Sequence, residues 1–183
     1  MELFPTPLPG VFIVRAQPVS DSRGSFARTY CADLFARQGL IVPLSVTARA
    51  TNRAAFTLRG LHFQVAPHEE TKLVSCVGGS VFDVVVDVRP RSPTWGQWFG
   101  TTLQASGDDA LYVPAGCAHG YLTLTDGAQV LYQMTDSHHP AAERGVRWDD
   151  PTLRIEWPAA PRVISERDRR LGELTDLVDP AGE

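Results

Sequence analysis

The chain has 183 residues, 43% hydrophobic and 21% charged, a balance that predicts one globular domain over residues 1–183. Its formal net charge of −4 lacks the basic excess with which proteins hold nucleic acid. The opening residues lack the positive start and apolar core of a signal peptide, and the most apolar stretch, Val81 to Val88, is too short to span a bilayer. Cys31, Cys76 and Cys117 form no Cys-x-x-Cys pair and are typical of reduced thiols. The sequence therefore predicts a cytoplasmic protein without a membrane or nucleic-acid partner.

Short apolar segments punctuated by glycine and proline run along the chain, a pattern typical of an all-β sandwich or barrel. In chain order, strands are predicted at Val11–Val14, Ser45–Ala50, Phe56–Phe63, Lys72–Cys76, Ser80–Val88, Trp98–Gln104, Leu111–Pro114, Gly120–Leu124 and Val130–Thr135. Helical signals are weak and local. They predict one helix at Cys31–Gln38, ended by Gly39, and a helix or turn at Ser165–Leu174 with Ser165 as its cap.

The segment from Val81 to Val88 alternates strictly. Because side chains alternate across a strand, one face carries Phe82, Val84, Val86 and Val88, and the other carries Val81, Asp83, Val85 and Asp87. Two aspartates among valines indicate either a lined cavity or an edge strand with one wet face, and the sequence does not choose between them.

The motifs typical of nucleotide-cofactor binding, serine hydrolases and metal binding are absent or incomplete. Gly-x-Gly-x-x-Gly, a phosphate-binding loop and Gly-x-Ser-x-Gly are all absent from the sequence. His62 is followed two residues later by Gln64, so a metal chelate from two histidines on one strand is incomplete. His138 and His139 are adjacent and in a strand would point to opposite faces. A metal site is therefore disfavoured.

A series of motifs in fixed order carries a stronger signal. These are Asp21-Ser-Arg-Gly-Ser-Phe26, Leu58-Arg-Gly-Leu-His-Phe-Gln64, Lys72, Val81-Phe-Asp-Val-Val-Val-Asp-Val-Arg89, Ser92-Pro-Thr-Trp-Gly-Gln-Trp98, Pro114-Ala-Gly-Cys-Ala-His-Gly120, Leu131-Tyr132 and Ser165-Glu-Arg-Asp168. Together they resemble the family of dTDP-4-dehydrorhamnose 3,5-epimerases over nearly the whole chain. The resemblance implies a mainly β, cupin-type double-stranded β-helix, or jelly-roll barrel, with short peripheral helices. It also implies a homodimer without metal or cofactor that binds a nucleotide-diphosphate sugar.

The resemblance implies four catalytic residues. The family inverts the carbons beside the C4 ketone of a 6-deoxy sugar, which requires a base, a stabiliser of the enolate oxygen and an acid across the ring. By resemblance, His62 is the base and Asp168 orients it, Lys72 supplies positive charge and Tyr132 returns the proton. From the residues alone, composition does not exclude a surface position for Lys72 after Glu69 and Glu70, and a core aromatic is the preferred interpretation of Tyr132. Asp83 pairs with Lys72 or lines the pocket.

The remaining family positions are substrate contacts. The positions that match are Arg23, Phe26, Arg59, Gln64, His119, Glu143 and Arg167. Four further positions at the nucleotide end depart from the family pattern, in which Glu, Gln, Asn and Tyr are usual: Arg28, Thr47, Arg49 and His138. An arginine cannot accept a hydrogen bond from the thymine N–H, so a base that presents acceptors would suit Arg28 better. Alternatively, Arg28 and Arg49 add phosphate contacts and dTDP remains the carrier, which is the reading that the family favours.

Three functions from different classes follow. The first is a cofactor-independent epimerase that inverts both carbons or only one. The second is a cupin that binds a sugar nucleotide without turnover, and the set of His62, Lys72, Tyr132 and Asp168 argues against it. The third is a metal-dependent cupin oxygenase, which the incomplete histidine pattern disfavours.

Overall fold

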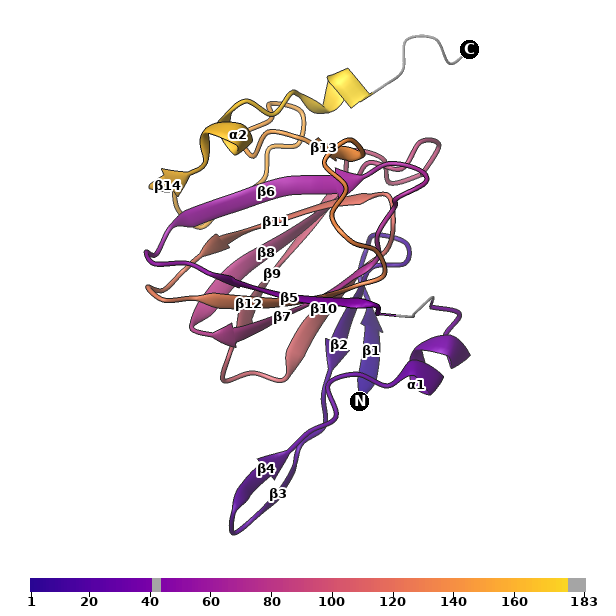
Figure 1. Ribbon diagram of the computed structural model, residues 1–183, viewed down its shortest axis with the longest axis vertical. Helices are drawn as coiled ribbons and strands as arrows, with labels where there is room; N and C mark the ends of the chain where they lie inside the picture. The colour runs from indigo at the N-terminus through magenta and orange to yellow at the C-terminus, as the bar shows by residue number, and fades with distance from the viewer. Residues whose placement is uncertain (41–43, 178–183) are drawn as a thin grey trace.

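Antiparallel strands dominate the computed structural model, which describes residues 1–40 and 44–177 (Figure 1). The strands are β1 (Glu2–Pro5), β2 (Phe12–Arg15), β3 (Val19–Asp21), β4 (Gly24–Phe26), β5 (Val46–Thr51), β6 (Thr57–Gln64), β7 (Lys72–Gly78), β8 (Ser80–Asp87), β9 (Trp98–Gln104), β10 (Asp109–Val113), β11 (Cys117–Thr123), β12 (Gln129–Met134), β13 (Glu143–Gly145) and β14 (Val163–Ile164). The helices are α1 (Ala32–Arg37), α2 (Glu166–Arg169) and a 3₁₀ turn at Leu174–Leu177. The predicted mainly β class is confirmed.

The strands form two large sheets. The first has the order β1-β2-β10-β7-β12-β5 and the second β13-β6-β11-β8-β9, with β14 added parallel to β6. Among the described strands, β3 and β4 pair with each other alone, and they form a hairpin that projects from the body of the molecule (Figure 1). Sequence neighbours thus often lie in different sheets, which brings distant segments together at one site.

The facing sides of the two sheets share one apolar core. Val74 and Val130 of the first sheet and Val85 and Tyr121 of the second are fully buried in it. Each such side chain stabilises the fold by roughly 1.5–3 kcal/mol relative to leaving it exposed. The facing sides of the two sheets are therefore joined by a packed apolar core.

Strand β8 follows the alternation that its sequence predicts. Val81 and Val85 pack between the sheets, whereas Val84 and Val86 pack in a second cluster on the outer side. The strand lies between β11 and β9, so the interpretation as an edge strand with one wet face is wrong. Asp83, although charged, is fully buried on the inward face.

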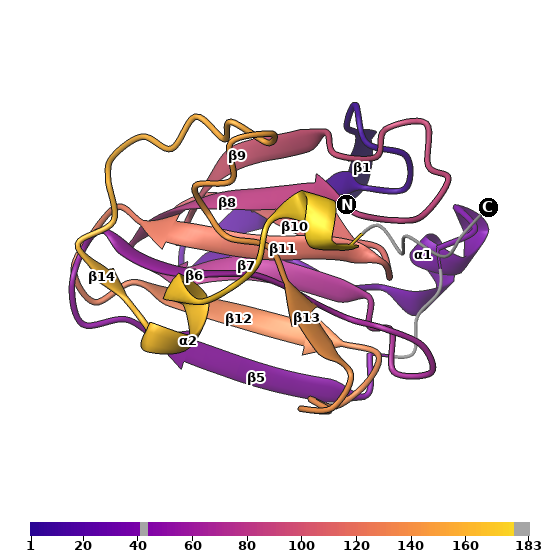
Figure 2. The ribbon, with the colours of Figure 1, turned by 90° about the horizontal axis from the view of Figure 1, so that it is seen from above.

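Both outer faces are covered in part. Phe35 of α1 packs against Tyr112 of the first sheet, with ring centroids 5.7 Å apart. On the second sheet, the segment after β13 lays Leu153 and Leu174 over Val84 and its neighbours, and it crosses this sheet in Figure 2. This C-terminal segment carries α2 to the edge of β6.

Some of the predicted helices and strands are confirmed, and others differ in length or were not predicted. The helix predicted at Cys31–Gln38 is confirmed as α1 with Cys31 and Gln38 as its caps. The predicted C-terminal helix is shorter than Ser165–Leu174, because α2 ends at Arg169, but Ser165 caps it as expected. Strands β1, β3, β4, β13 and β14 were not predicted, since each has only two to four residues. Within the described residues, no helix is long and apolar enough to cross a membrane.

Candidate active site

A cavity of about 760 Å³ opens beside β6, between β12 of the first sheet and the C-terminal segment. This volume lies in the range of small-molecule sites. The polar residues that line it include Arg59, His62, Tyr132, His138, Arg167 and Asp168. All six were singled out from the sequence, and β6, β12, α2 and the loop after β12 bring them together.

His62 and Asp168 form a hydrogen-bonded pair at the wall of the cavity. Nε2 of His62 lies 2.9 Å from Oδ1 of Asp168, and the His62 side chain is 23% exposed whereas that of Asp168 is 4% exposed. The second carboxylate oxygen accepts a hydrogen bond from the backbone N–H of Gly60 at 3.2 Å. The backbone N–H of Asp168 in turn donates to the cap hydroxyl of Ser165 at 3.0 Å. Strand β6 therefore bonds the carboxylate and the cap of α2 bonds the backbone of Asp168, so the carboxylate can hold the imidazole in one orientation.

Gly60 permits this arrangement sterically. A Cβ at this position would lie 2.6 Å from the carbonyl oxygen of His119 and 2.7 Å from Cα of Gly120, and φ is +107°. Only glycine tolerates both the close approach of β11 and this backbone conformation. The sequence Arg59-Gly60-Leu61 thus lets β6 approach β11 and direct a backbone N–H at Asp168.

The charge state of Asp168 sets the tautomer of His62. Burial alone would raise the pKa of Asp168, but hydrogen bonds from His62 and Gly60 outweigh it and hold this pKa below its ordinary value. A carboxylate only accepts, so Nε2 of neutral His62 carries the proton and Nδ1 keeps its lone pair. Within the described residues, Nδ1 of His62 has no hydrogen-bond partner. This nitrogen is the one available to take a proton.

Tyr132 lines the same cavity from the opposite sheet. Its ring packs edge-on against His119, with centroids 5.9 Å apart. Burial, followed by the neighbouring Tyr121 and Asp83, raises the pKa of Tyr132 well above its ordinary value. The phenol therefore keeps its proton at neutral pH and can donate it. The imidazole of His62 and the phenol of Tyr132 thus line one cavity.

His119 and Asp83 lie deeper, behind Tyr132. Nε2 of His119 is 2.8 Å from Oδ1 of Asp83, and both side chains are buried. Of the two alternatives for Asp83, pairing with Lys72 is wrong. Neither His119 nor Asp83 is among the residues that line the cavity, so direct contact of His119 with substrate requires access past Tyr132.

Lys72 is buried, and the interpretation as a surface residue is wrong. Its ammonium lies 2.7 Å from Oε1 of Glu70 and 3.5 Å from the backbone carbonyl oxygen of His62. The structure places it behind His62 rather than in the lining of the cavity. To reach an enolate oxygen, the ammonium must turn away from Glu70.

Arg59 is a cation in the cavity wall itself. Its Nε donates to Oδ1 of Asn52 at 2.8 Å, and the Asn52 amide donates to the hydroxyl of buried Tyr121 at 3.1 Å. This leaves the terminal nitrogens of Arg59 to face anionic groups. Asn52, just after β5, and Tyr121 of β11 were not predicted from the sequence, because an isolated polar residue does not identify a partner about 70 positions away.

The rim of the cavity carries a charged network. Oε2 of Glu143 accepts from Arg167 at 2.8 Å and from His138 at 3.0 Å. Burial would raise the pKa of Glu143, but the contacts with His138, His62 and Arg167 hold it below its ordinary value. A guanidinium nitrogen of Arg167 also lies 3.2 Å from Nε2 of His62. The three residues that the sequence placed at the substrate thus meet at one rim.

The sequence model of the dTDP-4-dehydrorhamnose 3,5-epimerase family matches residues 5–176. The chain belongs to this family. Curated epimerases of this name include that of Escherichia coli K12, 36% identical over 180 residues, which are 97% of each chain. A dTDP-4-dehydrorhamnose 3-epimerase of Streptomyces niveus is 38% identical over 170 residues, 92% of this chain and 82% of that protein.

Comparison with solved structures also finds epimerases of this family. The crystal structure of the 3,5-epimerase from Legionella pneumophila in complex with dTDP-4-keto-L-rhamnose matches with a TM-score of 0.90 and 33% identity. The match covers 97% of this chain and 94% of that chain. The cupin-type jelly roll is therefore the fold of this epimerase, as predicted.

Not all residues that resemble epimerase substrate contacts meet at the cavity. Arg23 and Phe26 lie on the projecting β3–β4 hairpin, and Arg28 follows it in a groove with Phe26. Thr47 and Arg49 are exposed on β5, whose neighbouring position Ala48 pairs with Tyr132. Since side chains alternate along a strand, Thr47 and Arg49 point away from the side on which Tyr132 lies.

Gln64 is also outside the cavity lining of the epimerase fold. Its side chain is 2% exposed, and its amide donates to the backbone carbonyl oxygens of His68 and Ser137 and to Glu70. Its carbonyl oxygen accepts from the backbone N–H of His139. These bonds occupy the amide, so the geometry supports a loop-fastening role in place of the predicted substrate contact.

Proposed function

We propose that this chain is a cofactor-independent epimerase that converts dTDP-4-dehydro-6-deoxy-D-glucose to dTDP-4-dehydro-L-rhamnose. The observation that carries the proposal is the shared cavity lined by the His62–Asp168 pair and by Tyr132. The nucleotide-linked sugar and its carrier are supported by the ligand of the Legionella relative.

In the proposed reaction, Nδ1 of His62 removes a proton from a carbon beside the C4 ketone. The electron pair of the broken C–H bond moves onto the ketone oxygen and forms an enolate. Asp168 stabilises the imidazolium through its hydrogen bond to Nε2. Tyr132 then donates its own proton from the other face of the ring, which inverts that carbon. The cycle closes when His62 releases its proton to solvent and the tyrosinate takes one up. The substrate is neither oxidised nor reduced, so no redox partner takes part.

Positive charge around the cavity serves the enolate and the diphosphate. Arg59 faces the cavity, and planar guanidinium groups bind phosphate oxygens in pairs. Lys72 supplies charge to the enolate oxygen once the ketone draws its ammonium from Glu70. Arg167 and His138 border the entrance and are held by Glu143.

The proposal includes a homodimer in which each copy completes the nucleotide end of its partner's site. The hairpin that carries Arg23 and Phe26 projects from the body of the molecule (Figure 1), and neither residue lines the cavity of its own chain. Val19 and Phe26 are paired across the hairpin and are 74% and 79% exposed, an apolar pair that a second copy would cover. Reaching the cavity of another copy would reconcile their predicted substrate contacts with this position.

The proposed location is the cytoplasm, supported by the chain's thiols. Cys31, Cys76 and Cys117 are all free in the structure. Burial raises the pKa of Cys117 to about 12, so this thiol stays protonated and unreactive. Such unpaired, buried thiols are typical of reducing compartments.

The proposal is tested by turnover of dTDP-4-keto-6-deoxyglucose, with the product identified by its ring coupling constants in ¹H NMR. We expect the 3,5-inverted sugar from the wild type and none from His62→Asn. A 3-epimerase is the second candidate, favoured by the Streptomyces niveus relative, and inversion at one carbon alone would identify it. Binding of dTDP without any conversion of this sugar would refute both and leave a binding cupin.

The carrier is tested separately by titrating dTDP, CDP, UDP and GDP. We expect dTDP to bind most tightly, with Arg28 beside the hairpin contacting phosphate in the site of the partner copy. A preference for CDP would instead show that the arginine at position 28 changes base recognition, because arginine only donates hydrogen bonds.

A further inference from the structure

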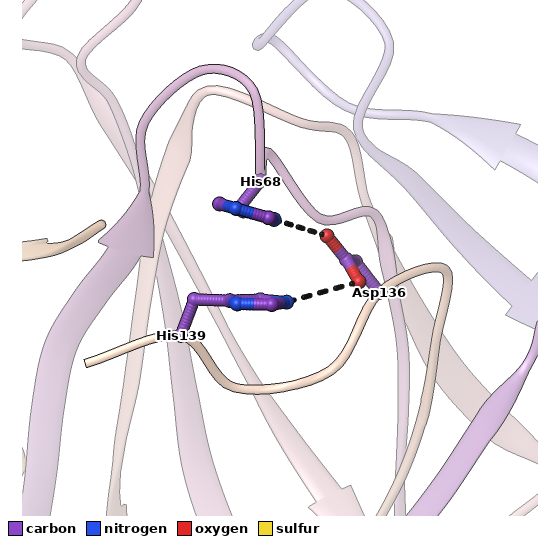
Figure 3. A group of neighbouring side chains, drawn as sticks. All are labelled: His68, Asp136 and His139. Atoms are coloured by element: carbon purple, nitrogen blue, oxygen red, sulfur yellow. Dashed lines mark hydrogen bonds and ion pairs between the residues drawn. The ribbon is translucent and has the colours of Figure 1, made fainter. Parts of the chain in front are cut away.

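Outside the cavity, two loops bring His68, Asp136 and His139 together (Figure 3). His68 lies in the loop between β6 and β7, whereas Asp136 and His139 lie in the loop between β12 and β13. Nδ1 of His68 is 3.1 Å from Oδ2 of Asp136, and Nε2 of His139 is 3.5 Å from Oδ1. One nitrogen from each ring and one carboxylate oxygen lie within 4.8 Å of one another.

The backbone around these side chains is fastened by buried Gln64. Its amide nitrogen donates to the carbonyl oxygens of His68 and Ser137, and its amide oxygen accepts from the N–H of His139. A single side chain thus bonds to the backbone of both histidines across the two loops. Because the main chain is held, the two imidazoles stay near each other without depending on their own contact.

The two rings lie close enough to share a cation once they tilt toward it. They are stacked with centroids 3.5 Å apart and planes 16° apart, and in Figure 3 both present a nitrogen to the same carboxylate. With metal–ligand bonds of about 2.0–2.1 Å, two ligand atoms of a tetrahedral zinc site lie roughly 3.3 Å apart. The distances of 3.1 Å from His68 to Oδ2 and 3.5 Å from His139 to Oδ1 are close to this spacing, and the three ligand atoms, one from each residue, lie within 4.8 Å of one another.

The donor set selects the kind of ion. Two imidazoles and one carboxylate are typical ligands of zinc and of neighbouring divalent transition metals, whereas magnesium and calcium prefer oxygen alone. The side chains of His68, His139 and Asp136 are 37%, 38% and 32% exposed. An ion can therefore enter from solvent, the rings can tilt toward it, and water can fill the remaining positions.

We propose that His68, Asp136 and His139 bind one divalent transition-metal ion of the zinc type, apart from the epimerase cavity. The ion would clamp the β6–β7 loop to the β12–β13 loop. The latter loop also carries His138, which lines the cavity, so the clamp would steady that wall without entering the chemistry. The sequence missed the site because His139 pairs with a histidine 71 positions earlier rather than with its neighbour.

Cobalt(II) titration of protein without a histidine tag tests the proposal, because Co²⁺ substitutes for zinc and its visible absorption reports coordination. We expect saturable binding of one Co²⁺ per chain and displacement by Zn²⁺. His139→Ala and Asp136→Asn should each weaken binding at least about tenfold, the lower end of the loss seen even for indirect metal partners. The matched control is His138→Ala, which removes the adjacent imidazole and should bind Co²⁺ as the wild type does.

A second measurement needs no variant. In the wild type, Co²⁺ should shift and broaden the imidazole proton signals of His68 and His139 before those of His62 and His119, and Zn²⁺ should raise the melting temperature. Absence of saturable binding, or cluster variants that bind Co²⁺ as tightly as the wild type, would overturn the proposal. So would paramagnetic shifts confined to His62 or His138, and this outcome decides the matter even if a variant fails to fold.

Discussion

Nε2 of His62 lies 2.9 Å from the carboxylate of Asp168, a residue 106 positions later in the chain. The C-terminal segment makes this contact by crossing the second sheet and placing α2 against β6. Because the carboxylate is buried and hydrogen-bonded, it can orient the ring and leave Nδ1 for the proposed role as base.

Asp168→Asn tests this relationship. The amide can turn its NH₂ group toward His62, which favours the tautomer with its proton on Nδ1 and removes the stabilisation of the imidazolium. We expect kcat to fall by about 10²- to 10⁴-fold with KM changed little. Asp149→Asn, which alters an exposed carboxylate paired with Arg147, should retain full activity. A wild-type kcat in Asp168→Asn would show that the pair is structural.

Tyr132→Phe separates proton removal from inversion. Without the hydroxyl, His62 can still take and return the proton on its own face. The variant should therefore exchange substrate protons with solvent while epimerisation falls about 10²- to 10⁴-fold. Tyr30→Phe, a hydroxyl deletion beside α1, serves as the control. Epimerisation by Tyr132→Phe at the wild-type rate would assign the acid to another group.

A mixture of two inactive variants tests whether the site is shared between copies. One carries His62→Asn, and the other carries Arg23→Ala together with Phe26→Ala on the hairpin. If the hairpin acts on the partner, each mixed dimer has one cavity with both parts intact. Random mixing then restores about a quarter of the wild-type sites, measured at limiting substrate after co-expression.

The control for this mixture pairs His62→Asn with Asp168→Asn. Both changes lie in the same cavity, so no mixed dimer has an intact site and activity should stay at the level of the separate variants. Equal results from the two mixtures would contradict a shared site, as would a monomer in light scattering.

Asp87 gives a prediction on stability. Burial would raise its pKa, but hydrogen bonds from Arg89, Ser92 and Thr94 lower it from 3.8 to about 2. A lowered pKa means that the carboxylate stabilises the fold above about pH 4, and that this contribution disappears as the pH falls toward 2. Asp87→Asn should therefore lower the free energy of unfolding by about 2 kcal/mol at pH 7.

Urea denaturation at pH 7 and at pH 3 measures this effect. The difference between the wild type and Asp87→Asn should shrink at the lower pH. The exposed Asp149→Asn should change stability by less than about 1 kcal/mol at either pH. A difference independent of pH would show that Asp87 acts by packing rather than by charge.

The sequence predicts well what depends on local pattern. Alternation along β8 correctly separated the valines of its two faces, because burial on opposite sides of a sheet has a period of two residues. The cap Ser165 was likewise predictable, since its role depends on the three residues that follow it. Motif order identified the family because the matching residues extend over nearly the whole chain.

Two kinds of feature could not be predicted from the sequence. One is a contact between loops that are distant in the chain, and the other is the face of a strand on which a given residue lies. Gln64 lies two residues after His62 on the same strand, yet the return of the β12–β13 loop occupies its amide. Thr47 and Arg49 are assigned by resemblance to the nucleotide end of the site, but the pairing of Ala48 with Tyr132 turns them away from the side on which Tyr132 lies. Lys72 closely follows Glu69 and Glu70, a pattern that is also compatible with an exposed side chain. In the structure the side chains of Lys72 and Glu70 are both buried and form an ion pair.

Isotope exchange tests directly whether His62 and Tyr132 exchange substrate protons across one cavity. The protein is incubated with dTDP-4-keto-6-deoxyglucose in D₂O, and the positions of deuterium in the product are read by NMR. The wild type should incorporate deuterium at the inverted carbons C3 and C5, and His62→Asn should incorporate it at neither carbon. Deuterium incorporation by His62→Asn at the wild-type rate, or inversion of these carbons without any incorporation, would contradict this mechanism.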